Sequence, residues 1–455
     1  MSTLDLQAVR RVLDGGIPPT LCSVSPDGIP HVNLLSHVEY VDRSHVALTF
    51  QFFNRSRANI LATQRASVMV EDPLTGAALV LQLRYLRTDT EGPIFERLRA
   101  KLAGIASHTG MEDVFRLRGA DLYEVLHIAC SHPTLPMATL QPRCDLAAGG
   151  RTVSARLAEC EDLALLPQVA MNGLREDLHI QHAILWLLDA ARHSLYALAS
   201  LGYEQQGIGA ELPLEAAGLA GVAVREGVAL RIGHMARMYR YSHALHQTAC
   251  AQGYPQGQPI PLPGLATPCS QLAVPLRARG RTVGVLLVES ERDQFFGYDD
   301  EDALAVLGAQ LAQALMTLQS AELEAHTAAQ ETAPGAGPTA LNGPVLHLRH
   351  FPRDGTVFID GQYLIKGVAG AILWKLAIAA QDHGHTHFTT RELRLAGESL
   401  GLPDVQDNLG VRLLLLQRRL ADWGGPLQIR KLRRGCYAFT SQRALQLETV
   451  DGATA

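Results

Sequence analysis

The feature that most constrains the fold of this chain is a run of small residues, Gly and Pro between Gln319 and Gly343. Such a composition buries too little apolar surface to order itself. A second, weaker interruption lies at 131–150, where prolines and glycines break any periodicity. The interruptions leave three blocks of single-domain size within 455 residues. We therefore predict domains at 1–132, 150–320 and 344–445, with a flexible linker at 321–343.

The composition is that of a globular protein. Hydrophobic residues make up 47% and charged residues 19%, which excludes a disordered or fibrous chain. No uninterrupted apolar run approaches 18 residues, and residues 1–16 lack the apolar core of a signal peptide. The seven cysteines are scattered without a CxxC pair, unlike a disulfide framework. We expect a cytoplasmic protein with no membrane association.

The charge is uneven along the chain. The whole chain carries a net charge of −5, yet residues 344–443 hold 14 Lys and Arg against 8 Asp and Glu, a local net of +6. Such asymmetry suggests one part that binds a polyanion joined to a part that does not. A solvated basic face is an equally good explanation of the charge alone.

The first block is predicted to contain short antiparallel strands and one or two helices. Two apolar alternations flank Asp27-Gly28, a strong signal for a hairpin turn. This pattern suggests a small β-barrel. The expected strands cover 20–24, 31–35, 45–53, 66–70, 77–85 and 121–128, and the expected helix covers 91–105.

Four segments of this block carry a family resemblance. Phe-Gln-Phe-Phe-Asn-Arg-Ser-Arg-Ala-Asn-Ile-Leu at 50–61, with 27–33, 68–73 and 117–123, resembles the pyridoxamine 5′-phosphate oxidase-like split barrel, which binds FMN. A hydroxyl and a planar guanidinium suit a dianionic phosphate. The resemblance implies phosphate contacts from Asn54, Ser56, Arg57 and Asn59.

The match to the true oxidases is incomplete. Their lysine is replaced by Ala58, and their C-terminal substrate motif is missing. The following Asn59-Ile60-Leu61 looks more like the haem-utilisation branch of the superfamily. We therefore expect FMN as the cofactor, with haem as the alternative. An empty or repurposed barrel is a further alternative.

The second block is predicted to begin with a helix at 153–171 and to end with one at 299–318. Hairpins are expected at 183–201 and 270–289. The last helix has an apolar seam suited either to pairing with a second copy or to packing on its own sheet. The seam residues are Leu304, Leu307, Leu311, Ala314, Leu318 and Ala321.

Residues 219–227 and 272–286, within a span of 153–318, resemble a GAF domain. GAF domains sense small ligands, and many dimerise through flanking helices. His243 and His246 form an i,i+3 pair near His234. They suit the binding of a metal or haem iron, but histidines in such positions more often lie on the surface or line a pocket. Cys250 and Cys269 are either redox-active or buried and inert. We predict no metal site.

The third block is predicted to contain strands, three helices and a final hairpin. The strands are expected at 345–348 and 357–359, and the hairpin at 427–440. Thr389 and Glu392 form a capping box before the second helix. The helices are expected at 367–381, 390–400 and 407–420.

Leu416-Gln417-Arg418-Arg419-Leu420 and the segment 429–437 resemble the C-terminal winged-helix effector domain of OmpR-type response regulators. The resemblance implies that the third helix enters the major groove and that the hairpin, or wing, lies along the backbone. It assigns groove contacts to Arg412, Gln417, Arg418 and Arg419, and phosphate contacts to Lys431, Arg433 and Arg434.

The third block departs from this pattern in two places. Cys436 replaces a glycine, and the four consecutive leucines at 413–416 leave fewer polar positions for reading bases. A winged helix used only for protein contact is therefore the alternative.

Together the blocks predict a multidomain α+β protein with an FMN-binding-type split β-barrel, a GAF α/β sensor domain and a winged helix-turn-helix. We expect a homodimeric one-component transcription regulator that senses a ligand or a redox state and binds DNA. One alternative is an FMN-dependent oxidoreductase with regulatory GAF and winged-helix domains, and another is a haem-handling protein. We assign no catalytic residues.

Overall fold

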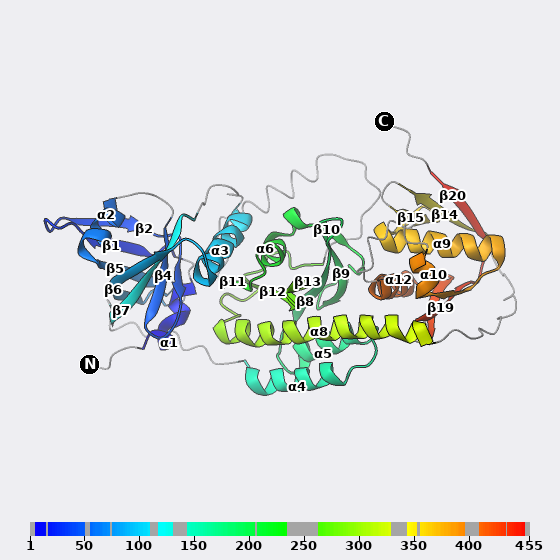
Figure 1. The fold of residues 1–455 in the computed structure, drawn as a ribbon, viewed down its shortest axis with the longest axis horizontal. Helices are drawn as coiled ribbons and strands as arrows, with labels where there is room; N and C mark the ends of the chain where they lie inside the picture. Colours follow the sequence, from blue (N-terminus) through cyan, green and yellow to red (C-terminus); the bar gives the residue numbers. More distant parts are fainter. Residues whose placement is uncertain are drawn as a thin grey trace.

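The structure is a computed structural model, and its three domains follow one another in a row (Figure 1). The long helix α8 runs alongside the middle and C-terminal domains. The structure describes residues 5–14, 17–50, 55–72, 75–109, 117–130, 143–204, 207–233, 263–328, 344–352, 355–395, 409–433 and 435–450.

The N-terminal domain is built on a seven-stranded antiparallel sheet in the order β2-β1-β5-β6-β7-β4-β3. The expected turn joins β1 to β2, and Gly28 adopts a φ of 84° there. Alternate residues of β6, Leu79, Leu81 and Leu83, are buried in the domain core. The elements are α1 (Leu6–Val9), a 3-10 helix (Arg10–Asp14), β1 (Thr20–Val24), β2 (Pro30–Leu34), β3 (Val38–Tyr40), β4 (His45–Phe50), α2 (Arg55–Thr63), β5 (Arg65–Glu71), β6 (Ala78–Asp89), α3 (Pro93–Thr109) and β7 (Gly119–Cys130).

The middle domain has a six-stranded sheet in the order β10-β9-β8-β13-β12-β11. Helices α4, α5 and α8 contribute to the apolar cluster on one face of the sheet. Helix α6 contributes to a separate cluster on the other face. The elements are α4 (Leu146–Glu159), α5 (Leu166–Glu176), β8 (His182–Asp189), β9 (Ser194–Leu201), β10 (Glu211–Pro213), a 3-10 helix (Leu214–Ala216), α6 (Gly218–Glu226), β11 (Leu230–Ile232), β12 (Ser270–Ala278), β13 (Arg281–Ser290) and α8 (Tyr298–Ala328).

The single helix predicted at 153–171 is wrong, because the chain forms α4 and α5 with a turn between them. The Asp162 carboxylate accepts a hydrogen bond from the Ala164 backbone N–H at 2.9 Å inside this turn. Pro167 then occupies the first turn of α5, where its missing N–H has no helical partner to lose.

Helix α8 continues to Ala328, beyond the predicted end at residue 318. Its seam residues Leu304, Leu307 and Leu311 are buried in the cluster on its own sheet, so the second of the two packing alternatives is the one observed. The stretch Tyr298–Ala321 is long and apolar enough by composition to cross a membrane. Of that stretch 39% is buried, and its buried leucines pack on the sheet.

The C-terminal domain combines a four-stranded sheet (β16-β15-β14-β20), a three-stranded sheet (β17-β19-β18) and helices. The predicted capping box is confirmed, because Thr389 N–H donates to Glu392 Oε2 and Glu392 N–H donates to Thr389 Oγ1. Strand β20, which pairs in parallel with β14, was not predicted. The elements are β14 (Leu346–Phe351), β15 (Thr356–Ile359), β16 (Gln362–Ile365), α9 (Gly367–His383), β17 (His387–Thr389), α10 (Thr390–Leu395), α12 (Leu409–Trp423), β18 (Leu427–Arg433), β19 (Cys436–Ser441) and β20 (Leu445–Thr449).

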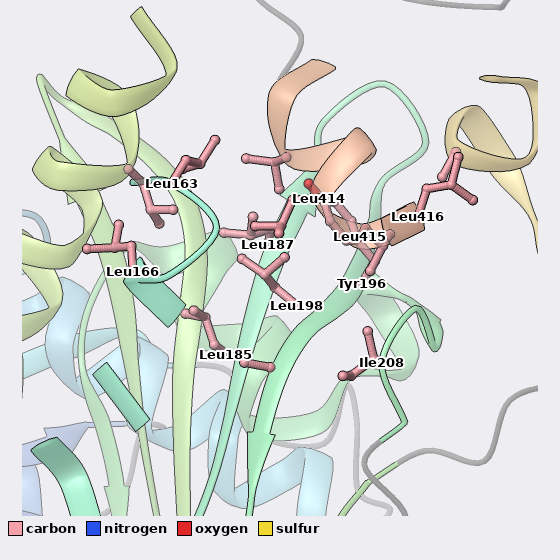
Figure 2. Packing of buried hydrophobic residues seen from close by; sticks show 14 of the residues in the cluster. Leu163, Leu166, Leu185, Leu187, Tyr196, Leu198, Ile208, Leu414, Leu415 and Leu416 are labelled. Carbon is pink, nitrogen blue, oxygen red and sulfur yellow. The ribbon is translucent and has the colours of Figure 1, made fainter. Parts of the chain in front are cut away.

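The middle and C-terminal domains share one apolar core. Leu414 and Leu415 of α12 lie against Leu187, Leu198 and Tyr196 of the middle sheet (Figure 2). The two leucines are 5% and 3% exposed. Burial of a leucine side chain contributes about 1.5–3 kcal/mol. The contact between these domains is therefore part of the folded core.

Candidate functional sites

The N-terminal domain contains a cleft of about 70 Å³ between β1, β2, β4, β7 and α2. Its lining is mostly apolar, with Arg57 and Asp121 as the charged members. The lining residues are Leu21, Leu34, Leu35, Ser36, Leu48, Thr49, Phe50, Arg57, Ile60, Asp121 and Tyr123.

Arg57 is engaged within the domain. Its Nη1 lies 2.6 and 2.5 Å from the two carboxylate oxygens of Asp121, and its Nη2 donates to Thr88 Oγ1 at 3.1 Å. The guanidinium also lies over the Phe50 ring, 3.8 Å from its centroid. The Asp121 charge therefore offsets the Arg57 charge that was predicted to meet a phosphate.

Two other predicted phosphate ligands face the interior. Ser56 is fully buried and accepts a hydrogen bond from Asn33 Nδ2 at 2.9 Å. Asn59 is buried and donates to Ser23 Oγ at 3.3 Å. Ser56 and Asn59 are three residues apart on one face of α2, so they point the same way. Asn54 lies outside the described residues.

A single chain in this arrangement does not fit FMN. Ligand pockets of this kind usually enclose about 300–1,000 Å³, several times the volume of the cleft. Of the described phosphate ligands, only Arg57 lines it, and Arg57 is paired with Asp121. A flavin would need a wider site, such as one completed by a second chain, and a free guanidinium.

Helix α12 of the C-terminal domain faces the middle domain. Arg412 Nη2 lies 2.5 Å from Asp189 Oδ2 at the end of β8, and both side chains are under a tenth exposed. The Arg412 guanidinium also lies over the Tyr196 ring, 4.1 Å from its centroid. This pair joins residues 223 positions apart across the domain boundary.

The other groove residues predicted on α12 are also engaged. Arg418 donates to the backbone carbonyls of Leu198 at 3.0 Å and Ala164 at 2.9 Å. Burial lowers the pKa of Arg418. The remaining two bond within their own domain: Gln417 donates to Ile429 O, and Arg419 donates to Leu364 O. In this arrangement none of the four presents its donors to a DNA groove.

The hairpin β18–β19 is more accessible. Lys431 is bound to the middle domain, with its Nζ 3.1 Å from Asp162 Oδ1. Arg433 is exposed and donates to Cys436 Sγ at 3.4 Å. Arg430, which sequence reasoning did not assign, is also exposed on β18. Arg434 lies outside the described residues. The exposed cations of this hairpin are those most available to a polyanion.

A second polar cluster, which sequence reasoning missed, joins the N-terminal and middle domains. Buried Arg231 of β11 pairs with both carboxylate oxygens of Asp14 and lies 3.1 Å from Glu301 of α8. Its guanidinium also lies over the Tyr298 ring, 4.2 Å from the centroid. Burial and the Asp14 and Glu39 carboxylates raise the pKa of Tyr298. No sequence motif marks these residues as neighbours.

The part of the chain that the structure describes contains no group of three or more His, Cys, Asp or Glu arranged to hold a metal ion. His234, His243, His246 and Cys250 lie outside the described residues, so the alternatives for them are untouched. Cys269 is partly exposed and is not in a disulfide.

Residues 161–316 match the family model of the GAF domain. They contain the sheet of the middle domain and most of α8, so this part of the chain is a GAF domain. Its recognition from 219–227 and 272–286 is confirmed. No curated protein matches the chain in sequence.

Solved structures similar to parts of the chain include an FMN-binding protein from Syntrophomonas wolfei subsp. wolfei. It is 16% identical and the match covers 29% of this chain and 85% of that one, with a TM-score of 0.23. The GAF domain of a phosphoenolpyruvate-protein phosphotransferase from Acinetobacter is 21% identical over 41% of this chain and 97% of that one, with a TM-score of 0.30. HupZ from Group A Streptococcus is 14% identical over 29% and 98%, with a TM-score of 0.23.

Proposed function

We propose that the protein is a one-component regulator in which the GAF domain senses a small ligand and the C-terminal domain binds DNA. The observation that carries this proposal is the direct contact between the two. Helix α12 shares its apolar core with the GAF sheet, so sensing and output domains are mechanically joined without a flexible connection at that point. A ligand of the GAF domain shifts the protein between two conformations only if it binds one of them more tightly. The contact with α12 would pass that shift to the C-terminal domain.

The assignment of the C-terminal domain as a winged helix is supported by its element order. Sheet, α9, α10 and α12 are followed by the basic hairpin β18–β19, as the resemblance implies. The net charge of +6 over 344–443 and the exposed Arg430 and Arg433 favour a polyanion as the partner. Dimerisation, which would match paired half-sites on DNA, is part of this proposal.

One observation favours a different output. Leu414 and Leu415 of α12 are buried in the core shared with the GAF sheet, whereas a groove-reading helix would carry polar side chains on the face that meets DNA. A C-terminal domain that only contacts protein would need no such side chains. We keep this protein-contact module as the second candidate function.

A salt titration of DNA binding by the full-length protein distinguishes the two candidates. Each Lys or Arg that contacts a phosphate contributes about one unit of slope to the dependence of log K on log salt. We expect Arg433→Ala to weaken binding to promoter and random DNA alike and to flatten this slope by about one unit. The matched control is Arg151→Ala, which removes an exposed arginine from α4, far from the hairpin in sequence.

If log K depends on log salt with the same slope in the wild type and in Arg433→Ala, Arg433 of the β18–β19 hairpin does not contact DNA. Absence of binding to either DNA at low salt, by the wild type and by Asp189→Asn, which weakens the contact between Arg412 of α12 and the GAF domain, would favour the protein-contact module.

A further inference from the structure

We propose that the β8–β9 hairpin of the GAF domain is an autoinhibitory latch that holds α12 away from DNA. This inference rests on the proposed function and adds its mode of regulation. The latch consists of the Asp189–Arg412 pair, the carbonyl of Leu198 and the apolar surface that covers Leu414 and Leu415. The turn before α5 adds the Asp162–Lys431 pair and the carbonyl of Ala164.

The latch occupies the cations that DNA would need. Asp189 neutralises Arg412, and Asp162 neutralises Lys431 at the base of the wing. Arg418 donates both terminal nitrogens to GAF carbonyls instead of to phosphates or bases. Three residues that were predicted to contact DNA, Arg412, Arg418 and Lys431, instead contact the GAF domain. These contacts must break before the three side chains can bind a nucleic acid.

The hairpin is also placed to transmit a signal. One face of β8 and β9 carries Ile184, Trp186 and Leu195, which belong to the cluster under α6. The other face carries Leu187 and Leu198, which belong to the core shared with α12. A shift of the hairpin caused by repacking on the α6 face would therefore act directly on the α12 contact.

A second set of contacts, centred on Glu211, also joins the GAF domain to the C-terminal domain. Glu211 of β10, which pairs with β9, accepts a hydrogen bond from Ser194 at 2.7 Å. Its other carboxylate oxygen lies 3.5 Å from Lys366 Nζ, at the start of α9. The C-terminal domain is thus held by the same edge of the GAF sheet at α9 as well as at α12.

In this scheme the apparent affinity for DNA is the intrinsic affinity multiplied by the fraction of molecules with α12 released. Asp189→Asn keeps the size of the side chain and an acceptor for Arg192 N–H, but it removes the charge that holds Arg412. We expect the full-length Asp189→Asn protein to bind DNA about tenfold more tightly at low salt. We also expect faster amide hydrogen exchange in α12.

The matched control is Asp14→Asn, which weakens a buried arginine–aspartate pair at the other domain boundary. It should leave both DNA affinity and exchange in α12 at wild-type values. Asp162→Asn supplies a second latch variant, in which the changed side chain is 43% exposed and the amide oxygen can still accept the Ala164 N–H. It should shift both measurements in the same direction as Asp189→Asn, by a smaller factor.

The outcomes separate failure of the latch from failure of the proposed function. Tight DNA binding by the wild type, unchanged in both latch variants, would overturn the latch and leave DNA binding intact. Faster exchange in α12 without any DNA binding would overturn both autoinhibition and the DNA output, and would favour the protein-contact module. Tighter binding together with faster exchange supports the latch.

Discussion

Two arginines that sequence reasoning assigned to ligand contacts, Arg57 to the phosphate of FMN and Arg412 to a DNA groove, are both paired with an aspartate of the same chain. Arg57 meets Asp121 within the N-terminal domain, where α2 approaches β7. Arg412 meets Asp189 across the boundary between the GAF and C-terminal domains. The first pair lines a cleft, whereas the second is sealed in a shared core.

The difference lies in what can open each pair. Arg57 and Asp121 belong to one sheet-and-helix unit, so an incoming anion must compete with Asp121 at a fixed distance. Arg412 and Asp189 belong to two domains, so a movement of one domain against the other would separate them, at the cost of opening the apolar core that the two domains share. Under the proposed function, Asp121 opposes anion binding in the N-terminal domain as folded, whereas Asp189 opposes it only while the GAF and C-terminal domains are in contact.

The largest effect is expected from Arg412→Ala. It leaves the Asp189 carboxylate buried without its cation, and loss of one partner of a buried pair costs about 3–5 kcal/mol. Urea unfolding followed by tryptophan fluorescence measures this, because all three tryptophans, 186, 374 and 423, lie in the two joined domains. The control is the double variant Asp189→Leu/Arg412→Met, which should recover most of the loss. A loss below about 1 kcal/mol would mean that the pair is not sealed from water.

Arg57→Ala should have a smaller effect, of about 1–3 kcal/mol on the N-terminal domain. Asp121 keeps the Thr88 hydroxyl as a hydrogen-bond donor, and the pair borders an open cleft. Hydrogen exchange in β7 measures this domain separately, since it contains no tryptophan. If Arg57→Ala lost as much unfolding free energy as Arg412→Ala, the Arg57–Asp121 and Arg412–Asp189 pairs would not differ in their contribution to stability.

Asp121→Asn tests whether the counter-charge, and not the missing lysine, limits flavin binding. Removal of the aspartate charge frees Arg57 for a phosphate, and we expect affinity for FMN to rise about tenfold, or about 1.4 kcal/mol. Fluorescence titration with FMN measures it, with Asp89→Asn as a control outside the cleft. If neither the wild type nor Asp121→Asn quenches flavin fluorescence, the FMN prediction is wrong.

The smallest effect near neutral pH is expected at a third buried carboxylate. Burial alone would raise the pKa of Glu39, but Lys101 at 2.6 Å and His37 at 3.1 Å outweigh it and hold the pKa well below its usual range. The unfolded pKa is about 4.3, so Glu39 should contribute a constant stabilisation between pH 7 and pH 5. The contribution should fall as the pH drops below that value.

Acid unfolding of the N-terminal domain, followed by hydrogen exchange in β3, checks this sign. Glu39→Gln should unfold with a shallower dependence on pH. A wild-type stability that instead fell between pH 7 and pH 5 would show that Glu39 is not held in its charged form.

Much of the local structure was predictable because it depends on neighbours in sequence. The Asp27-Gly28 turn and the Thr389–Glu392 capping box form from residues only a few positions apart, and both are present. The GAF assignment rested on segments that each cover one element and its turn. The break between α4 and α5 was missed, although Pro167 was a visible signal for it.

The ion pairs that the predicted binding residues form within the chain could not be predicted in the same way. Asp121 lies 64 residues from Arg57, and Asp189 lies 223 residues from Arg412, so no periodicity links them. One signal was present in the sequence. Four consecutive leucines at 413–416 cannot all face one side of a helix, and their burial on both sides of α12 requires a partner domain.

The shared core also bears on how the chain is made. The GAF sheet is complete in sequence by Ser290, more than a hundred residues before α12 begins at Leu409. A nascent or truncated chain that lacks α12 would expose Leu187, Leu198 and Tyr196 as an apolar patch, the kind of surface that drives aggregation. Helix α12 therefore covers an apolar surface of the GAF domain, and a soluble GAF fragment should require this helix or a polar replacement of the surface it covers.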